Sequence, residues 1–364
     1  MAPAVIPTLT GAGHAVIVEA GAGAAAGIPD AAYVDVGAEI VSGAAGAVGQ
    51  AEVVLRVQAP SPEEVGTVPG GATLVALFAP GRSVDSVRAL AQKGVTAHSL
   101  ELLPRTTRAQ SMDALSSQST VAGYRGVLMA ANRLPRFFPM FMTAAGTVPP
   151  AKLLVLGAGV AGLQAIATAR RLGAVVSAYD VRSAARGEVE SLGGKFVELG
   201  LESADGAGGY AAEQTDAAQQ AQRDALAQHL AAADVVLTTA QIPGRPAPLL
   251  VTTSMLGAMK PGSVVIDLAS DSGGNVEGSD PSREVDVGGV AVIGVANAAS
   301  GLATHASQLY ARNLANFVAL VSKEGALAPD YEDDIVRDTC VTRDGRIVHE
   351  PTRALIEAGG AHVG

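Results

Sequence analysis

The fold is decided by one stretch, residues 152–180, which reads KLLVLGAGVAGLQAIATARRLGAVVSAYD. An apolar run is followed by Gly157, Gly159 and Gly162 and then by a helical pattern. In a G-x-G-x-x-G turn the first glycine permits the tight turn, the second lets backbone approach a pyrophosphate, and the third lets the helix lie close to the strand. The stretch predicts a strand, a phosphate-binding turn and a helix whose N-terminus faces a dinucleotide. The alternative is that the glycines only pack an α/β turn.

An acidic residue ends the next predicted strand. Asp180 closes AVVSAYD, where its carboxylate would accept hydrogen bonds from both hydroxyls of the adenosine ribose. The same carboxylate would repel a 2′-phosphate, which favours NAD over NADP. Arg182 argues the other way, because an arginine can hold that phosphate. We give more weight to the acid and expect NAD(H).

Strand and helix patterns alternate outward from this stretch in both directions. VVLRVQAP and ATLVALFAP precede the helical SVDSVRALAQKG, and ADVVLTTA, SVVIDLA and VAVIGVA continue the alternation after the glycine turn. This pattern is typical of parallel sheets built from βαβ units. We therefore predict an α/β fold with two Rossmann-like, doubly wound parallel-sheet lobes and a cleft between them.

The lobes are predicted to be discontinuous in sequence. Residues 1–120 form an N-terminal lobe that the C-terminal tail, 306–364, completes, and residues 121–305 form the NAD(H)-binding lobe. The tail contains a helical pattern, THASQLYARNLANFVALVSKEG, and then VTRDGRIVHEP, which predicts a hairpin with its turn at Asp344 and Gly345.

Composition argues against several classes of protein. The net charge is −10, there is no tryptophan, and only 3% of residues are aromatic, so the chain offers neither a basic surface nor a stacking platform for nucleic acid. Its apolar runs are broken by glycine and arginine before they reach the ~20 residues of a membrane span. Cys340 is the single cysteine, and no signal-peptide pattern opens the chain. We expect a cytoplasmic protein with no membrane span, no disulfide and no metal site.

Two polar segments stand out in this small-residue sequence. RAQSMDALSSQ, residues 108–118, brings charges and amides into a region where alanine, valine and leucine would be usual. Residues 202–222 contain glycines at 206, 208 and 209 ahead of a polar, alanine-rich helix, which predicts a mobile loop. Both segments are candidates for ligand contacts.

In chain order, these motifs resemble one family. RAQSMDALSSQSTVAGYRGVLMAA and FFPMFMTAAGTVPP precede the glycine turn, and DVRS, GGYA, TTAQIPGRPAP and KPGSVVIDLASDSGGN follow it. From about residue 10 to the C-terminus, the chain resembles the NAD(H)-binding component, the domain I or alpha-1 type subunit, of proton-translocating nicotinamide nucleotide transhydrogenase. That family shares its fold with alanine dehydrogenase.

The resemblance implies an oxidoreductase that acts only within an assembly. This chain would hold NAD(H), a partner subunit would hold NADP(H), and membrane subunits would couple direct hydride transfer to proton translocation. Its place would be the inner face of the plasma membrane, reached through those partners, and the component would be a homodimer. Transfer from C4 to C4 needs near-attack geometry and exclusion of water, and it needs no general acid from the protein.

The resemblance also implies roles for individual residues. Arg105, Asp113 and Ser116 would surround the nicotinamide carboxamide and ribose, and Gln110 would reach toward the partner's nucleotide. Tyr210 would lie on a flap that closes over the nucleotide. The further nucleotide contacts that it implies are Val160, Val181, Gly209, Gln222 and Gln241, beside the glycines, Asp180 and Arg182. The alternative for the 105–116 group is a helix N-cap and a surface ion pair, and for Tyr210 it is a tyrosine packed in a loop.

The sequence departs from the family at two places. Gln241 replaces an apolar residue in TTAQIPGRPAP, which would alter a contact on the adenine side or leave only the backbone to act there. The chain opens at MAPAVIPTLTGAGHAVIVEAG, later than the family's first strand, and we expect the first lobe to lack that strand.

Two other functions compete with transhydrogenation. An alanine dehydrogenase would need an acid/base imidazole and a cation for the substrate carboxylate. However, the family's lysine is Arg56 here, and LVALFAPGRS holds no histidine where one is expected; the six histidines, all elsewhere, are His14, His98, His229, His305, His349 and His362. The second competitor is a non-enzymatic NADH-binding regulator, which would need the glycine turn and Asp180 but not an outward-facing Gln110.

Overall fold

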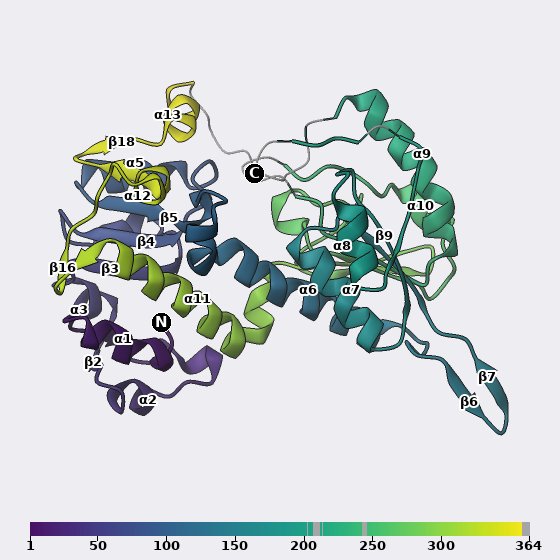
Figure 1. Cartoon of the computed structure of the whole chain (residues 1–364), viewed down its shortest axis with the longest axis horizontal. Coiled ribbons are helices and arrows are strands. Elements are labelled where there is room, and N and C mark those ends of the chain that lie inside the picture. Colours follow the sequence, from purple (N-terminus) through teal and green to yellow (C-terminus); the bar gives the residue numbers. More distant parts are fainter. Residues whose placement is uncertain (202, 207–211, 213, 242–245, 359–364) are drawn as a thin grey trace. The chain divides into compact units, whose positions relative to one another are not determined.

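The chain divides into two compact units. A computed structural model describes residues 1–201, 203–206, 212, 214–241 and 246–358. Unit 1 comprises Met1–Gln118 and Leu302–Gly364, and unit 2 comprises Ser119–Gly301 (Figure 1). Helix α6, Ala114–Arg133, contains the first crossing from one unit to the other, and the second crossing directly precedes helix α11, Ala303–Leu320. The predicted α/β class with parallel sheets is confirmed.

Unit 2 is built on a seven-stranded sheet in the order β10-β9-β8-β11-β12-β14-β13. All neighbours pair in parallel except β13 and β14, which are antiparallel. The strands are β8 (Lys152–Leu156), β9 (Val175–Tyr179), β10 (Lys195–Phe196), β11 (Val235–Thr238), β12 (Val264–Asp267), β13 (Glu284–Val287) and β14 (Val290–Gly294). A separate hairpin of β6 (Phe141–Thr143) and β7 (Gly146–Val148) extends away from this sheet (Figure 1).

Helices cover both faces of this sheet. Along β8, Leu153 and Val155 belong to one buried cluster, and Leu154 and Leu156 belong to another. This alternation gives a strand of continuous apolar sequence that is buried on both sides. The first cluster includes side chains of α6, α7 (Val160–Arg171) and α8 (Ala185–Ser191), and the second includes side chains of α9 (Asp216–Ala232) and α10 (Thr253–Gly257). Unit 2 is therefore doubly wound, as predicted.

Unit 1 has a five-stranded sheet in the order β18-β17-β5-β4-β3. The parallel strands are β3 (Val53–Gln58), β4 (Thr73–Leu77) and β5 (Thr96–Ser99), and the antiparallel additions are β17 (Cys340–Arg343) and β18 (Arg346–Ile347). The remaining short strands pair as β1 (Ile17–Glu19) with β2 (Glu39–Val41), and as β15 (Ser322–Lys323) with β16 (Ala326–Leu327). The tail thus completes the first unit, as expected, and its hairpin turns at Asp344 and Gly345, which both have positive φ.

One expectation for unit 1 needs correction. Its main sheet is mixed, because the tail adds an antiparallel hairpin to the edge at β5. The N-terminal strands β1 and β2 form a separate parallel pair and do not extend this sheet. The alternation of apolar runs predicts strands correctly, but it does not specify which edge a distant segment joins.

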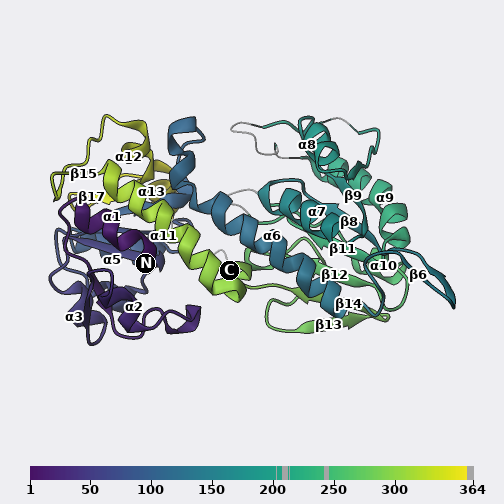
Figure 2. The same cartoon turned by 60° about the horizontal axis from the view of Figure 1, so that its bottom comes forward.

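The helices of unit 1 also lie on two faces of its sheet. Buried side chains of α4 (Pro62–Val65) and α5 (Val84–Gln92) pack on one face, and those of α11 and α12 (Asp334–Thr339) pack on the other. A short 3-10 helix, η4 (Thr107–Met112), lies with α11 on the second face. Figure 2 shows α11 beside α1. The other helices of unit 1 are α1 (Ile6–Gly11), α2 (Asp30–Val34), α3 (Ala44–Val48) and α13 (Glu350–Glu357).

Candidate nucleotide site

The glycine-rich turn of unit 2 requires glycine at two positions for steric reasons. Gly157 follows β8 with a φ of +97°, in the left-handed region that side chains disfavour. A Cβ on Gly162 would lie 1.9 Å from the carbonyl oxygen of Gly157, which is backbone and cannot move aside. That carbonyl accepts a hydrogen bond from Thr239 Oγ1 at 2.8 Å. The turn and the start of α7 are thus in direct backbone contact.

The N-terminus of α7 has the features of an anion site. Gly159 is its N-cap residue, and no side chain caps the helix there. A Cβ on Gly159 would meet no atom within 4 Å, and the next residue, Val160, is 39% exposed. The first backbone N–H groups of a helix have no partner within the helix, and the helix dipole favours negative charge at this end. The turn therefore fits a dinucleotide pyrophosphate.

Asp180, directly after β9, is joined to the turn. Its Oδ2 accepts a hydrogen bond from Ala158 N at 2.7 Å, and its carboxylate is 8% exposed. Arg182 covers the same carboxylate, with Nε at 2.9 Å from Oδ1 and Nη2 at 3.1 Å from Oδ2. The backbone N of Arg182 also donates to Oδ1, at 2.9 Å.

This pairing changes the simple expectation for Asp180. A carboxylate offers about four acceptor positions, and these contacts use them, so a ribose hydroxyl would have to displace the guanidinium. Arg182 is also held by the carbonyl oxygen of Ala158, at 3.0 Å from Nη2. The acid and the base that argue for different nucleotides in the sequence form one ion pair beside the turn.

The other nucleotide contacts implied by the resemblance are placed unequally. Val181 lies between the two members of the ion pair, and Gln222 is buried in α9. Gln241 is exposed, with Nε2 at 3.0 Å from Ser272 Oγ. The polar partner of Gln241 is thus a serine of the loop after β12. Gly209 and Tyr210 lie outside the described residues.

The loop after β11 has an anchor that sequence reasoning missed. Asn275 is fully buried; its Oδ1 accepts from Ala240 N at 3.0 Å, and its Nδ2 donates to the carbonyl oxygens of Ala240 and Pro248 at 2.9 and 2.8 Å. Asp267, at the end of β12, accepts from the backbone N of Asn275 at 3.0 Å, and burial raises its pKa. The available signal was the acid that ends SVVIDLA, followed by GGN.

The group implied at the nicotinamide end lies in unit 1 around η4 and the start of α6. Asp113 Oδ1 accepts from Ser116 N at 2.8 Å, and Oδ2 accepts from Ser116 Oγ at 2.5 Å. This is the N-cap arrangement that the sequence left open as an alternative. Arg105 and Gln110 are exposed. The structure brings Asp113 and Ser116 together, and their contact with a nucleotide stays a prediction.

Comparison with known proteins places this geometry in a family. The models for the alanine dehydrogenase/PNT N-terminal and C-terminal domains match residues 1–122 and 126–350. The chain belongs to the alanine dehydrogenase/PNT family. The first segment of the two-piece NAD(P) transhydrogenase subunit alpha of Rhodospirillum rubrum is 50% identical to it over 96% of this chain and 94% of the relative.

Solved structures agree with this family assignment. A transhydrogenase from Sinorhizobium meliloti is 45% identical, with a TM-score of 0.83 over 96% of this chain and 94% of that one. An L-alanine dehydrogenase has a TM-score of 0.82 over 98% of this chain and 95% of that one, at 26% identity. The higher identity to transhydrogenases supports a nucleotide-binding oxidoreductase related to their alpha subunits, with NAD(H) as the nucleotide that the family suggests.

The residues relevant to an alanine dehydrogenase are engaged elsewhere. Arg56 Nη2 lies 2.8 Å from Glu64 Oε1, and Glu64 also completes a capping box at the start of α4. His98 is 1% exposed, and burial lowers its pKa to about 4. Its ring lies against Phe317, with centroids 5.2 Å apart. Both side chains therefore support the fold of unit 1.

Metal-binding clusters and membrane-spanning helices are both absent from the described residues. No group of three or more His, Cys, Asp or Glu side chains among them could hold a metal ion. No helix in the same region of the chain is long and apolar enough to cross a membrane.

Proposed function

We propose that this chain is the NAD(H)-binding subunit of a proton-translocating transhydrogenase. The observation that carries the proposal is the uncapped N-terminus of α7 beside Asp180, in a chain that is 50% identical to a transhydrogenase alpha subunit over 96% of its length. Nucleotide binding is assigned to unit 2, within the predicted lobe of residues 121–305. The partner subunit would hold NADP(H), and membrane subunits would couple the reaction to proton movement.

The chemistry comes from the nucleotide, and the chain supplies position. Bound NADH supplies a hydride from C4 of its nicotinamide. Backbone N–H groups at Gly159 and Val160 would hold the pyrophosphate, and Asp180 would accept from the adenosine ribose once Arg182 moves off its carboxylate. Because hydride passes directly between two rings, no side chain needs to donate or accept a proton.

At the other end of the nucleotide, the residues around η4 would orient the ring. Asp113 and Ser116 would hold the carboxamide and ribose, with Arg105 as a cation for the same groups, and Gln110 would extend toward the partner's nucleotide. Val181, Gly209, Tyr210, Gln222 and Gln241 remain proposed nucleotide contacts. The assembly would lie at the inner face of the plasma membrane.

A direct assay separates this function from its competitors. The purified chain is mixed with membranes that bear the NADP(H)-binding and membrane subunits, and NADPH-dependent reduction of an NAD analogue is measured. Activity is expected only in the mixture, and it should fall at least tenfold in Gln110→Asn while NADH affinity is retained. Loss of affinity and transfer together would favour a binding protein, and alanine-dependent NAD reduction by the chain alone would favour an alanine dehydrogenase.

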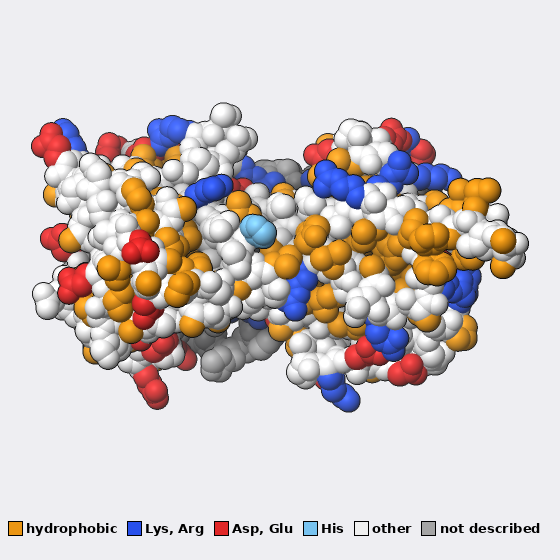
Figure 3. Space-filling model, turned by 90° about the horizontal axis from the view of Figure 1, so that it is seen from below, with side chains coloured by type: hydrophobic (Ala, Val, Ile, Leu, Met, Phe, Trp, Pro, Cys, Tyr) orange, Lys and Arg blue, Asp and Glu red, His pale blue; other side chains and the backbone are white. Residues whose placement is uncertain are grey.

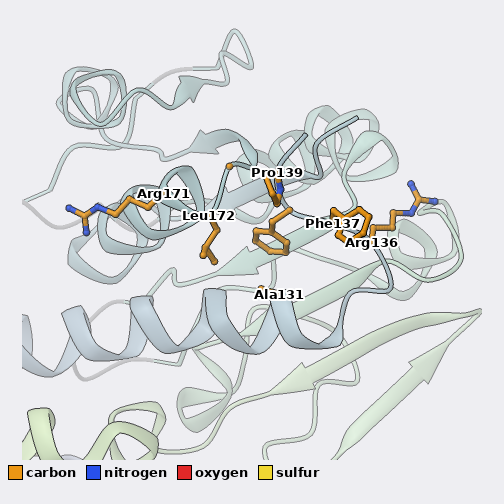
Figure 4. Close-up of a pocket in the computed structure, with 8 residues that line it drawn as sticks. Ala131, Arg136, Phe137, Pro139, Arg171 and Leu172 are labelled. Carbon is orange, nitrogen blue, oxygen red and sulfur yellow. The ribbon is translucent and has the colours of Figure 1, made fainter. Parts of the chain in front are cut away.

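The proposed homodimer has a candidate surface on the β6–β7 hairpin. Exposed apolar side chains include Phe137, Met140, Phe141 and Val148, and Met142 is 77% exposed. Figure 3 shows hydrophobic side chains gathered at the hairpin end of unit 2. A pocket lined by Phe137, Pro139 and Leu172 lies at the hairpin base, with Arg136 and Arg171 directed away from each other (Figure 4). Apolar surface of this kind marks protein contacts.

The dimer can be tested without nucleotide. Light scattering after size exclusion should give twice the chain mass for the wild type and the monomer mass for Met142→Lys. Val175→Lys is a matched control, because Val175 is also an exposed apolar residue of unit 2. A monomeric wild type would remove the dimer from the proposal.

A further inference from the structure

The position of η4, which carries Gln110, is set by α11. Ala109 and Met112 of η4 are buried in the same cluster as Tyr310 and Leu314 of α11. Such apolar contact holds the two segments together, but it is not directional and does not fix their register. The register must come from hydrogen bonds.

Two asparagines of α11 supply these hydrogen bonds. The carbonyl oxygen of Ser111 accepts from Asn313 Nδ2 at 3.0 Å and from Asn316 Nδ2 at 2.9 Å. The asparagines are three positions apart on a helix, so they lie on one face. A carbonyl oxygen has two lone pairs, so these two amides satisfy the Ser111 carbonyl fully. Asn313 is 6% exposed, whereas Asn316 is exposed.

Asn313 also reaches the start of α6. Its Oδ1 accepts from Ser117 Oγ at 2.7 Å. Gln118 Nε2 then donates to Ser117 Oγ at 3.1 Å and to the carbonyl oxygen of Ala306, in α11, at 3.2 Å. One buried amide therefore ties η4 to the helical turn that begins with Asp113.

We infer that Asn313 is a positioning residue for hydride transfer. It fixes Gln110, on η4, relative to Asp113 and Ser116, at the start of α6, and so sets the geometry around the nicotinamide. The inference rests on the function proposed above. Displacement of a positioning group by about 1 Å can cost on the order of 100-fold in rate, whereas most of the contacts to NADH proposed above lie in unit 2 and are untouched by Asn313.

The decisive variant is Asn313→Asp in the full chain. It keeps the size of the side chain and the oxygen that accepts from Ser117, but it turns a second oxygen toward the Ser111 carbonyl in place of a donor. Transfer at saturating NADH, in the mixture with partner subunits, should fall about 10- to 100-fold. NADH affinity should stay within about threefold, read from the fluorescence of NADH in a chain that has no tryptophan.

Controls separate positioning from charge and from stability. Gln308→Glu adds the same charge to α11 at an exposed position and should leave transfer unchanged. Asn316→Ala removes only one of two donors and should give a smaller loss, because Asn313 still holds Ser111. Amide hydrogen exchange of the chain alone should accelerate in residues 107–113 of Asn313→Asp, and its thermal unfolding should stay cooperative.

The outcomes divide cleanly. Transfer and exchange equal to wild type in Asn313→Asp would overturn the inference, although the proposed function would stand. Parallel loss of transfer, NADH affinity and cooperative unfolding, with full activity in Asn316→Ala, would make Asn313 a purely structural residue and also overturn it. A wild-type chain that binds NADH but transfers no hydride in any mixture would overturn the proposed function itself, and the inference with it.

Discussion

The glycine turn of unit 2 and the η4–α6 segment of unit 1 are held in different ways. In the turn, Gly162 meets Gly157, five positions earlier in the sequence, and Asp180 bonds to Ala158, 22 positions away. In the second segment, Ser111 depends on Asn313, 202 positions away, and Arg108 pairs with Asp333, 225 positions away. A local site can be recognised from a short motif, whereas a site supported by distant residues cannot.

The largest expected effect breaks the turn itself. In Gly162→Ala the new Cβ would lie 1.9 Å from the Gly157 carbonyl oxygen, so β8 and α7 must separate. We expect the free energy of unfolding to fall by about 3 kcal/mol and NADH binding to be lost. Thermal unfolding and NADH fluorescence measure the two effects.

Gly159→Ala is the matched control for that variant. Its φ is −73°, and a Cβ there would meet nothing within 4 Å, so stability should be unchanged. NADH affinity should still fall about tenfold or more, because the methyl group occupies the space in which backbone approaches the pyrophosphate. Equal stability loss in both variants would show that the two glycines do not differ as their geometry requires.

The next effect concerns nucleotide choice. Asp180→Asn removes the charge that repels a 2′-phosphate and releases Arg182 from its ion pair. We expect NADH affinity to fall about tenfold and NADPH affinity to rise, because the freed guanidinium can hold the phosphate. Asp205→Asn is the control, since Asp205 is exposed and accepts from Ser183 N at 2.9 Å. An unchanged ratio of the two affinities in Asp180→Asn would remove Asp180 from nucleotide selection.

The smallest effect sharpens the contrast through pH. His98, on β5, is bonded to Thr339, 241 positions away, and its pKa in the folded chain is lowered to about 4 by burial, from 6.5. Above pH 6.5 the ring is neutral in both states. As the pH falls from 6.5 toward 4, only the unfolded chain binds the proton, so the free energy of unfolding falls by up to about 3 kcal/mol.

The pH effect should be confined to unit 1. Hydrogen exchange at pH 5 should quicken around β5 and α12 before it quickens around β8 and α7. His98→Asn should lose the share of the stability change between pH 7 and 5 that the imidazole causes. A variant with the same pH dependence as wild type would show that His98 is not its source.

The candidate site was predictable in proportion to how local its support is. The strand, turn and helix around Gly157 to Gly162 and the position of Asp180 follow from residue type and spacing. The ion pair of Asp180 with Arg182 did not, because a sequence gives both side chains but not the direction in which each points. Asp113 and Ser116 had two interpretations, and the structure shows the cap, which leaves their contact with a nucleotide as a prediction.

By itself the sequence determined the class of the fold, the doubly wound sheet of unit 2 and the tail hairpin at Asp344 and Gly345, since periodicity and turn residues act over a few positions. Only the tertiary structure decided that this hairpin joins the sheet at β5, that Asn275 anchors the loop after β11, and that Asn313 holds η4. Hydrogen-bond partners far apart in sequence are chosen by packing. A lone asparagine in a helical pattern carries no local signal of the carbonyl that it will meet.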